Sequence, residues 1–244
     1  ITGLKYDLDY KISPNFGLDI PMEQISKGNG ESCVLSAYSS SVINLSNHFT
    51  TSLGITAQYF TLNKNWTVEP RAALKWTFNP KHALALAYGL HSRRERLDYY
   101  FVEQEVNGKT ESNRYLNFSK AHHFGLTYDW NINSYMHLKV EPYYQYLFRI
   151  PVEENSSFSI INHQSFYLER ILKNRGSGVN YGIDITLEQY MKNGFYYMIT
   201  ASLFKSRYKA GDHIWRNTRL DKNYLLNVLA GKEWMVGRNK QNVL

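Results

Sequence analysis

The segment Tyr135-Met-His-Leu-Lys-Val-Glu-Pro-Tyr-Tyr-Gln-Tyr-Leu-Phe-Arg149 carries the pattern that decides the fold. Its even-numbered positions, from Met136 to Phe148, are all apolar or aromatic, whereas charged residues such as Lys139 and Glu141 occupy odd-numbered positions. Successive side chains of a β-strand point to opposite faces. The segment therefore predicts a strand with one apolar face and one charged face.

The same alternation recurs along most of the chain. It is clear in residues 4–12, 68–78, 179–187 and 195–203, and about eleven such segments can be recognised. Most are about 10–15 residues long, whereas a typical strand has about 5–6. Helical periodicity is almost absent. The sequence therefore predicts an all-β fold built from long antiparallel strands.

The connections between these segments differ in length. Tight turns rich in Asn, Pro and Gly are predicted at residues 13–15, 46–48, 79–81, 131–133, 191–194 and 237–239. Other connections, most of them longer and more polar, are predicted at residues 23–33, 62–66, 92–118, 150–178 and 209–222. Short and longer connections alternate, which is typical of an up-and-down meander with one short-turn end and one long-loop end.

The composition excludes several classes of protein. The chain has 244 residues, a formal charge of +7, 15% aromatic residues and a single cysteine, Cys33. It has no apolar run of the ~18 residues that a transmembrane helix requires, and no signal peptide is visible at its start. One cysteine excludes an intrachain disulfide framework and a Cys-rich zinc site. Lys and Arg are scattered, apart from Arg93, Arg94 and Arg96, which argues against a nucleic-acid surface.

Strand length and aromatic placement indicate which face of the strands points outward. A tilted strand needs about 9–11 residues to cross a bilayer. Tyr and Trp residues gather near strand ends, as at Trp76, Trp130 and Tyr144, where an outer-membrane barrel carries aromatic girdles. Charges on a lipid-facing surface would cost about 2–4 kcal/mol each, so they suit a wet lumen. These features favour a transmembrane barrel over a soluble all-β domain.

Two prolines lie inside predicted strands. Pro70 and Pro142 each end a Val-Glu-Pro triplet, and proline cannot donate to a strand ladder. We expect a β-bulge at each site.

Five segments together resemble the barrel of a TonB-dependent outer-membrane receptor, with the character of the Bacteroides-type nutrient receptors. They are residues 66–76 (WTVEPRAALKW), 84–92 (LALAYGLHS), 120–130 (KAHHFGLTYDW), 139–145 (KVEPYYQ) and 175–184 (RGSGVNYGID). The resemblance extends from about residue 34 to the end of the chain. Each motif is moderately specific, and their order and spacing strengthen the match.

The resemblance implies a barrel of about 22 strands whose lumen holds an N-terminal plug domain. It also implies an extracellular substrate site between plug and loops, and an N-terminal motif that engages TonB. About eleven strands make half of such a barrel. We therefore expect residues 1–244 to form a partial outer-membrane β-barrel domain, with the plug, the TonB-binding region and the terminal strands absent from this chain.

Charged residues of the predicted lumen face form one candidate set. They could guide substrate, but a polar wall that contacts the plug is the interpretation we favour. The set is Glu69, Arg71, Lys75, Lys139, Glu141, Asp184 and Glu188.

Residues of the predicted long loops form the candidate substrate site. Aromatic faces with planar guanidinium groups suit sugars, carboxylates or anionic chelates. The alternative is a solvated loop that meets lipopolysaccharide. The candidate residues are Arg93, Arg94, Arg96, Tyr99, Tyr100, Trp215 and Arg216.

No catalytic, metal or cofactor motif is found. Cys33 lies in a polar stretch without a motif, and His122 and His123 would point to opposite faces of a strand. No Gly-x-Ser-x-Gly elbow occurs. We therefore expect neither catalysis nor a cofactor.

The function expected from the sequence is TonB-dependent active import of a scarce nutrient across the bacterial outer membrane. The expected partners are outer-membrane lipid, the plug, TonB, a small-molecule, glycan or chelate substrate and, as an open question, a surface lipoprotein. Two alternatives stay open: a passive or enzymatic outer-membrane barrel, and a soluble all-β binding domain.

Overall fold

The computed structural model describes residues 2–12, 23–106, 108–165, 167–236 and 242–243. Its dominant element is one antiparallel sheet of eleven strands. These strands are β1 (Thr2–Ile12), β2 (Glu23–Asn44), β3 (Phe49–Phe60), β4 (Asn65–Asn79), β5 (His82–Arg93), β8 (Ser119–Asn133), β9 (Met136–Val152), β10 (Lys173–Lys192), β11 (Phe195–Lys209), β12 (Trp215–Asn217) and β13 (Tyr224–Lys232).

The remaining elements are short. They are the hairpin β6 (Glu103–Val106) and β7 (Lys109–Ser112), the pair β14 (Met235–Val236) and β15 (Asn242–Val243), and the 3-10 helices η1 (Leu97–Phe101), η2 (Asn113–Tyr115) and η3 (Ile160–Asn162). Among the described residues, no helix has the length and apolar character needed to span a membrane.

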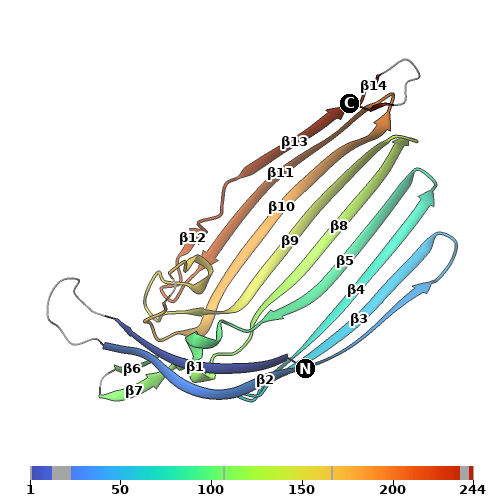
Figure 1. The fold of residues 1–244 in the computed structure, drawn as a ribbon. Helices are drawn as coiled ribbons and strands as arrows, with labels where there is room; N and C mark the ends of the chain where they lie inside the picture. Colours follow the sequence, from blue (N-terminus) through green and yellow to red (C-terminus); the bar gives the residue numbers. More distant parts are fainter. Residues whose placement is uncertain (1, 13–22, 107, 166, 237–241, 244) are drawn as a thin grey trace.

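The sheet is an up-and-down meander. Strands pair in the order β1-β2-β3-β4-β5-β8-β9-β10-β11, and β12 and β13 both pair with β11 (Figure 1). The long connections lie together at the lower left of Figure 1, and tight turns lie at the opposite end. The predicted all-β antiparallel fold is confirmed: the described strands form one open portion of a β-barrel wall.

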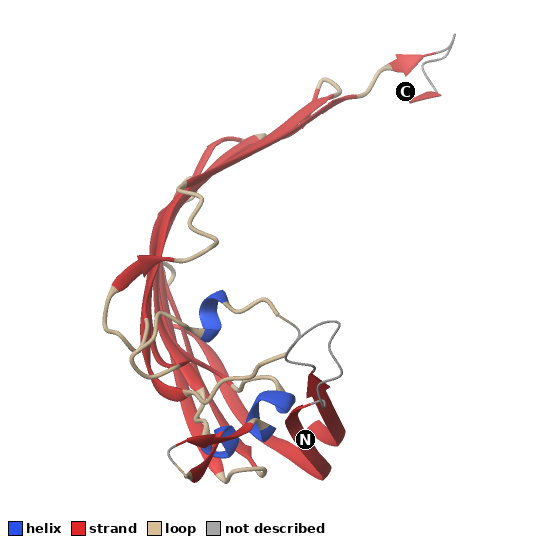
Figure 2. Ribbon diagram, turned by 90° about the vertical axis from the view of Figure 1, so that its left-hand side faces the viewer, coloured by secondary structure: helices blue, strands red, loops and turns tan. Residues whose placement is uncertain are grey.

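The sheet is a single curved layer. Seen from the side it forms an arc, and the three 3-10 helices lie within its hollow (Figure 2). One packing contact fixes which face is concave, because Tyr100 of η1 packs against Phe60 of β3 with ring centroids 5.3 Å apart. The face that carries Phe60 is called the inner face below, and the opposite face the outer face.

Strand register carries this assignment across the sheet. Arg71 on β4 shares the face of Phe60, and it lies opposite Gly89 on β5. Gly89 lies opposite His123 on β8, which in turn lies opposite Gln145 on β9. The odd-numbered residues of β9 up to Leu147 therefore belong to the inner face, and the alternating apolar residues belong to the outer face.

The main hydrophobic core lies at the long-loop end, between the inner face and the loops. Aromatic side chains of η1 meet Phe60 there, together with residues from the connections after β7 and β9. Its buried members are Phe60, Tyr99, Tyr100, Phe101, Val102, Leu116, Phe118, Leu168 and Leu172. The loops are thus folded onto the wall and do not extend freely from it.

The bulges expected at Pro70 and Pro142 are absent. Pro70 pairs with Ile55 and Pro142 pairs with Ile183, and neither pairing shows a register shift there. Each proline turns the side that lacks an N–H toward its other neighbouring strand, where no ladder hydrogen bond is formed at that position. The β4–β5 pairing begins only at Arg71, and the β8–β9 pairing is interrupted beside Pro142. Each proline therefore interrupts one ladder without an inserted residue.

One predicted connection is wrong, because residues 23–33 are part of strand β2. The connection predicted at 62–66 is present as a tight turn between β3, which ends at Phe60, and β4, which begins at Asn65. Gly28 lies in β2 and makes room for an aromatic ring, since a Cβ there would lie 2.5 Å from the Phe101 side chain. The turns predicted at 13–15 and 237–239 lie outside the described residues.

Candidate functional site

Two belts of rings mark the outer face. Near the tight turns, ring centroids lie 4.9–5.9 Å apart among Phe49, Trp76, Phe78, His82, Tyr128 and Trp130. Toward the long loops, the spacing is 5.0–6.5 Å among Tyr88, His122, Phe124, Tyr144, Tyr146 and Phe148. On β8 the two belts together extend from His122 to Trp130, about 26 Å along the strand, and their facing edges at Phe124 and Tyr128 are about 13 Å apart.

An aliphatic band fills the space between the belts. Leu86 on β5 is 58% exposed and Val228 on β13 is 64% exposed. Val140 on β9 lies opposite Ile185 on β10 in the same band, and neither belongs to a buried core cluster. The outer face therefore presents bare apolar side chains between aromatic rows, the pattern that suits a lipid-facing barrel wall.

The inner face carries the predicted wall charges. The register places all seven of them on this face: Glu69, Arg71, Lys75, Lys139, Glu141, Asp184 and Glu188. Lys139 lies 2.7 Å from Glu141. The carboxylate of Glu69 accepts hydrogen bonds from Arg71 at 3.1 Å and from Gln58 at 2.9 Å. Whether these residues contact a plug stays a prediction.

A polar row crosses three strands of the inner face and ends on the residue after β12. Asn180 on β10 donates to Gln145 on β9 over 3.1 Å, and Ser206 on β11 donates to Asn180 over 2.7 Å. Thr218, just beyond β12, donates to the Ser206 hydroxyl over 2.8 Å. These bonds satisfy polar groups within the wall and keep a hydrophilic surface at one level of the barrel.

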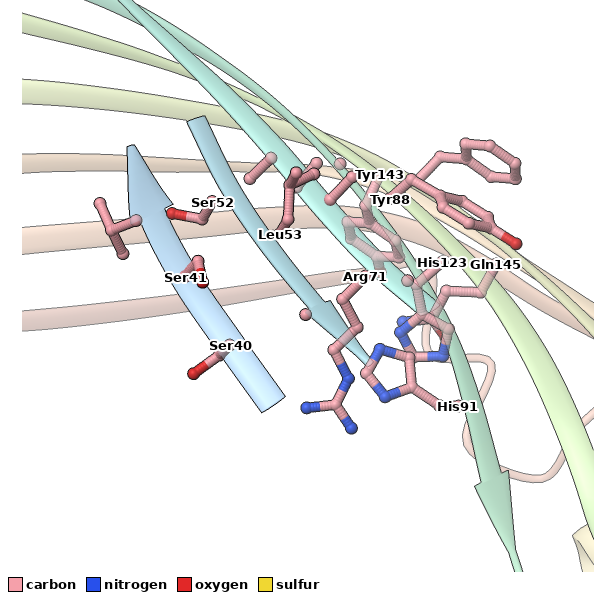
Figure 3. A pocket seen from close by; sticks show the side chains of 18 residues that line it. Ser40, Ser41, Ser52, Leu53, Arg71, Tyr88, His91, His123, Tyr143 and Gln145 are labelled. Carbon is pink, nitrogen blue, oxygen red and sulfur yellow. The ribbon is translucent and has the colours of Figure 1, made fainter. Parts of the chain in front are cut away.

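A shallow hollow of about 490 Å³ lies on the wall between β2 and β9 (Figure 3). Figure 3 shows Arg71 and His91 extending to the same side of the sheet, close to His123. The rings of His91 and His123 have centroids 4.4 Å apart. Gly54 leaves space on this face, whereas the ring of His91 lies over Gly89, where a Cβ would come within 2.7 Å of its Nε2. The hollow can receive a segment or solute in the lumen.

The histidine neighbours at 122 and 123 do point to opposite faces. His122 accepts or donates at 3.0 Å with the Tyr88 hydroxyl on the outer face, whereas His123 pairs with His91 on the inner face. Across the described ranges, no three His, Cys, Asp or Glu side chains come close enough to hold a metal ion.

The predicted arginine cluster lies where β5 enters the loops. Arg96 holds Asp98 with two hydrogen bonds of 3.1 and 3.0 Å and lies over the Tyr99 ring at 5.1 Å. Arg94 lies 5.9 Å from the Phe60 ring, and Arg93 is largely exposed. The three side chains have different environments and do not form a single cationic surface.

Two predicted substrate residues are buried. Tyr99 and Tyr100 belong to the core under η1, and Tyr100 is 1% exposed. The Tyr100 hydroxyl accepts a hydrogen bond from the backbone N–H of Glu95 over 3.2 Å. Burial raises the pKa of Tyr100 to about 12. Their positions suit packing of the loop against the wall more than contact with solute.

The predicted residues of the last long loop lie together around β12. Arg216 forms a two-bond pair with Asp212, at 2.9 and 2.5 Å, and this hydrogen bonding lowers the pKa of the Asp212 carboxyl. Trp215 faces the cations of Arg207 and Lys209, at 5.9 and 5.6 Å from its ring. This leaves an exposed aromatic surface with basic neighbours.

Asn113 is a structural residue that the sequence reading missed. Its side chain is 1% exposed and links two loops. Its Nδ2 donates to the carbonyl of Arg170 over 2.9 Å, and its Oδ1 accepts from the N–H of Leu172 over 2.7 Å. A single asparagine in a polar loop gives no sequence signal for such a role, because its partners lie nearly 60 residues away.

The fold can be compared with known proteins. No protein-family profile and no curated protein matches the sequence. Solved structures do match in shape. The ferric-catecholate import receptor Fiu from K12 E. coli superposes with a TM-score of 0.64 at 9% identity, over 89% of this chain and 34% of that one. The sheet thus has the fold of part of the barrel of such a receptor.

Two further matches agree. The siderophore receptor PirA from Pseudomonas aeruginosa gives a TM-score of 0.62 at 10% identity, over 88% of this chain and 40% of PirA. The RagAB peptide importer gives 0.54 at 14% identity, over 78% of this chain and 23% of that one. This chain thus spans well under half the length of the receptors it resembles, and at these identities the likeness concerns the fold.

Proposed function

We propose that this chain is part of the wall of a TonB-dependent transporter that imports a scarce nutrient across the bacterial outer membrane. One observation carries the proposal: a curved sheet with the fold of such a barrel turns its aliphatic band outward and its charges inward. In a soluble all-β domain the apolar face would be covered instead. The exposure of Leu86 and Val228 therefore favours a lipid-facing wall.

The proposed orientation follows from the two ends of the sheet. The long loops lie outside the cell and the tight turns lie in the periplasm, as in outer-membrane barrels generally. The two ring belts lie at the two membrane–water interfaces, where amphipathic aromatic side chains are favoured.

The inner face supplies contacts rather than catalysis. Its carboxylates, guanidinium groups and amides form a polar wall for a plug domain of the same receptor, which TonB would move through a region outside this chain. A Bacteroides-type receptor would add a surface lipoprotein over the long loops; the likeness in shape to RagAB is compatible with that subtype. No covalent step is assigned to this chain.

The solute is contacted by exposed and partly exposed groups of the long loops. Arg93, Arg96, Trp215 and Arg216 offer planar cations and an aromatic face for glycans, carboxylates or anionic chelates. Arg94, Tyr99 and Tyr100 would act by holding η1 against the wall.

The proposal is tested by energy dependence. A strain lacking the full-length gene is compared with its parent for growth on single sources of iron chelate, glycan or peptide, each with and without TonB. We expect growth on one class to require both genes. Growth that needs the gene but not TonB, together with a steady ion conductance of the purified protein in planar bilayers, would establish the passive-barrel alternative.

Arg93, Arg94 and Arg96 are then replaced together by Gln in the full-length protein. We expect weaker binding of the growth-supporting solute with normal barrel assembly. Unchanged affinity would remove this cluster from the binding site.

A further inference from the structure

A second cavity, of about 480 Å³, lies where the long loops meet the inner face. Its floor is formed by the ends of β5, β8 and β9, and its roof by η3 and the residue that follows it, His163. Its volume falls within the range of small-ligand sites, about 300–1,000 Å³. The hollow of Figure 3 is lined by strands of the sheet alone, whereas this cavity is also covered by a loop segment, Ile160, Ile161 and His163.

Glu95 lines this cavity and carries a buried carboxylate oxygen that makes no hydrogen bond. Its side chain is 2% exposed, and its Oε1 accepts a hydrogen bond from the Ser119 hydroxyl over 2.5 Å. Its Oε2 has no hydrogen-bond partner. Arg93 lies 3.8 Å from Oε2, beyond hydrogen-bond length, and its side chain is 79% exposed to water. A buried acceptor of this kind is costly to leave unsatisfied.

His163 places a second unpaired atom there. Its Nε2 is buried without a hydrogen bond, while its ring is held edge-to-face by Tyr99 at 5.8 Å and by Phe158 at 5.5 Å. The imidazole donates to the backbone of Tyr167, which leaves Nε2 as the free nitrogen. Burial lowers the pKa of His163, so the ring is neutral and Nε2 offers a lone pair.

The two atoms require the same kind of partner. A carboxylate oxygen and a neutral imidazole nitrogen are both acceptors, so a ligand that satisfies them must donate. The aliphatic part of the lining is formed by Leu147, Ile150, Ile160 and Ile161, and the rest is polar or basic, with His91, Ser92, Arg93, Ser119, Lys120 and His123. A group with several N–H donors and a positive charge, attached to a short apolar chain, matches both features.

We propose that this cavity binds a primary ammonium group carried on an apolar chain, with Glu95 and His163 as its two acceptors. The ammonium hydrogens point to Glu95 Oε2 and His163 Nε2, and the alkyl chain lies against the isoleucines of η3. Binding of the ammonium group in this cavity does not depend on the proposed transport function. A role for the cavity in selecting the imported solute rests on the proposed function.

The test uses the full-length protein in detergent micelles and two matched probes, n-butylammonium and n-butyltrimethylammonium. Both carry one positive charge and the same chain, but only the first has N–H donors. Saturation-transfer NMR and competition titration measure binding. We expect n-butylammonium to bind at least tenfold more tightly. Equal affinities would overturn the proposal, because they would indicate simple attraction of cations.

Substitutions then locate the site. In Glu95→Gln the amide oxygen can still accept from Ser119, while an NH₂ group replaces the free acceptor, so we expect at least a tenfold loss of n-butylammonium affinity. His163→Phe keeps an aromatic ring in the roof and removes the lone pair, and should also weaken binding severalfold. Glu153→Gln is the control, because Glu153 pairs with Arg170 at 2.6 Å and does not line the cavity.

Each result of these binding measurements either supports or overturns the proposal. Unchanged affinity in both Glu95→Gln and His163→Phe overturns the proposal, and so does an equal loss in Glu153→Gln. Should Glu95→Gln fail to assemble, the His163→Phe variant and the probe pair on the unmodified protein still decide. Binding is measured without an energy source, so it can fail while TonB-dependent growth is observed, and the reverse.

Discussion

Glu141 on β9 and Asp184 on β10 lie directly opposite each other on the inner face of the sheet. Glu141 is paired with Lys139 and accepts a hydrogen bond from Thr127 over 3.2 Å. Asp184 has no cation within ion-pair distance in the part of the chain that is described. Two carboxylates in register repel each other unless water or a further cation lies between them. Their pairing therefore marks the inner face as a wet surface or a contact surface.

Replacing Asp184 with Asn tests this relationship. Like charges directly opposite each other cost roughly 0.2–1 kcal/mol, so we expect the free energy of unfolding to rise by up to about 1 kcal/mol. The gain should shrink in high salt. Urea titration in phospholipid vesicles measures it, and Glu188→Gln, which lies opposite His137, serves as the control. A loss of stability would instead indicate a cation held between the two carboxylates.

Asn113 should hold two loops together. Asn113→Ala leaves the Leu172 N–H and the Arg170 carbonyl without partners in a buried place, at about 1–3 kcal/mol for each group. We expect faster hydrogen–deuterium exchange at the Leu172 amide. Asn174→Ala removes comparable bonds to Asn117 and Arg149 at an exposed position, where water can replace them, so Leu172 should stay protected. Equal protection in both variants would refute the role of Asn113.

Tyr100 should make the loop packing sensitive to alkali. Its pKa is raised by burial to about 12, above the usual 10, so folding favours the protonated phenol. The resulting stability is present below pH 10 and is lost as the pH rises from 10 to about 12. We expect near-ultraviolet circular dichroism to change over that interval while the far-ultraviolet spectrum keeps its strand signal.

Tyr100→Phe should remove most of that pH dependence. It also leaves the Glu95 N–H unpaired, at a cost of about 1–3 kcal/mol at neutral pH. Tyr115→Phe is the matched control because Tyr115 is an exposed residue of the same connection. An alkaline transition that persists in Tyr100→Phe would assign it to another group.

Leu86 and Ala87 should report the two faces of β5. In a Cys33→Ser background, a fluorophore is attached at Leu86→Cys or at Ala87→Cys, and the protein is placed in vesicles that contain nitroxide-labelled lipid. Leu86 lies on the outer face and Ala87 on the inner face, so quenching is expected only at position 86. Strong quenching at 87 alone would reverse the assignment of the faces.

The strands were largely predictable because their cause is local. Alternation in the segment around Val140 predicts both a strand and the face of each side chain, and the register with β10 confirms the pattern. The prolines were misjudged because a missing N–H can be accommodated on one side of a strand. Which side has a partner depends on the neighbouring strand, which a local sequence pattern does not reveal.

The loops were predictable in position but not in conformation. Tyr99, Tyr100 and Phe101 resemble an exposed aromatic cluster in the sequence, yet they pack under the loop against Phe60. Gly28 resembles a turn residue, yet it lies in a strand beneath Phe101. In both cases a long-range contact decided the outcome. The substrate role of the arginines and of Trp215 stays a prediction.

Strand β2 runs for 22 residues, or about 70 Å, more than twice the ~30 Å of a hydrocarbon layer. Even when it is steeply tilted, such a strand must extend beyond the bilayer. In a receptor that contains this strand, the long loops would rest on strand ends that are hydrogen-bonded to their neighbours. A force applied to a plug from the periplasm could then displace the plug while the extracellular end of the barrel keeps its shape.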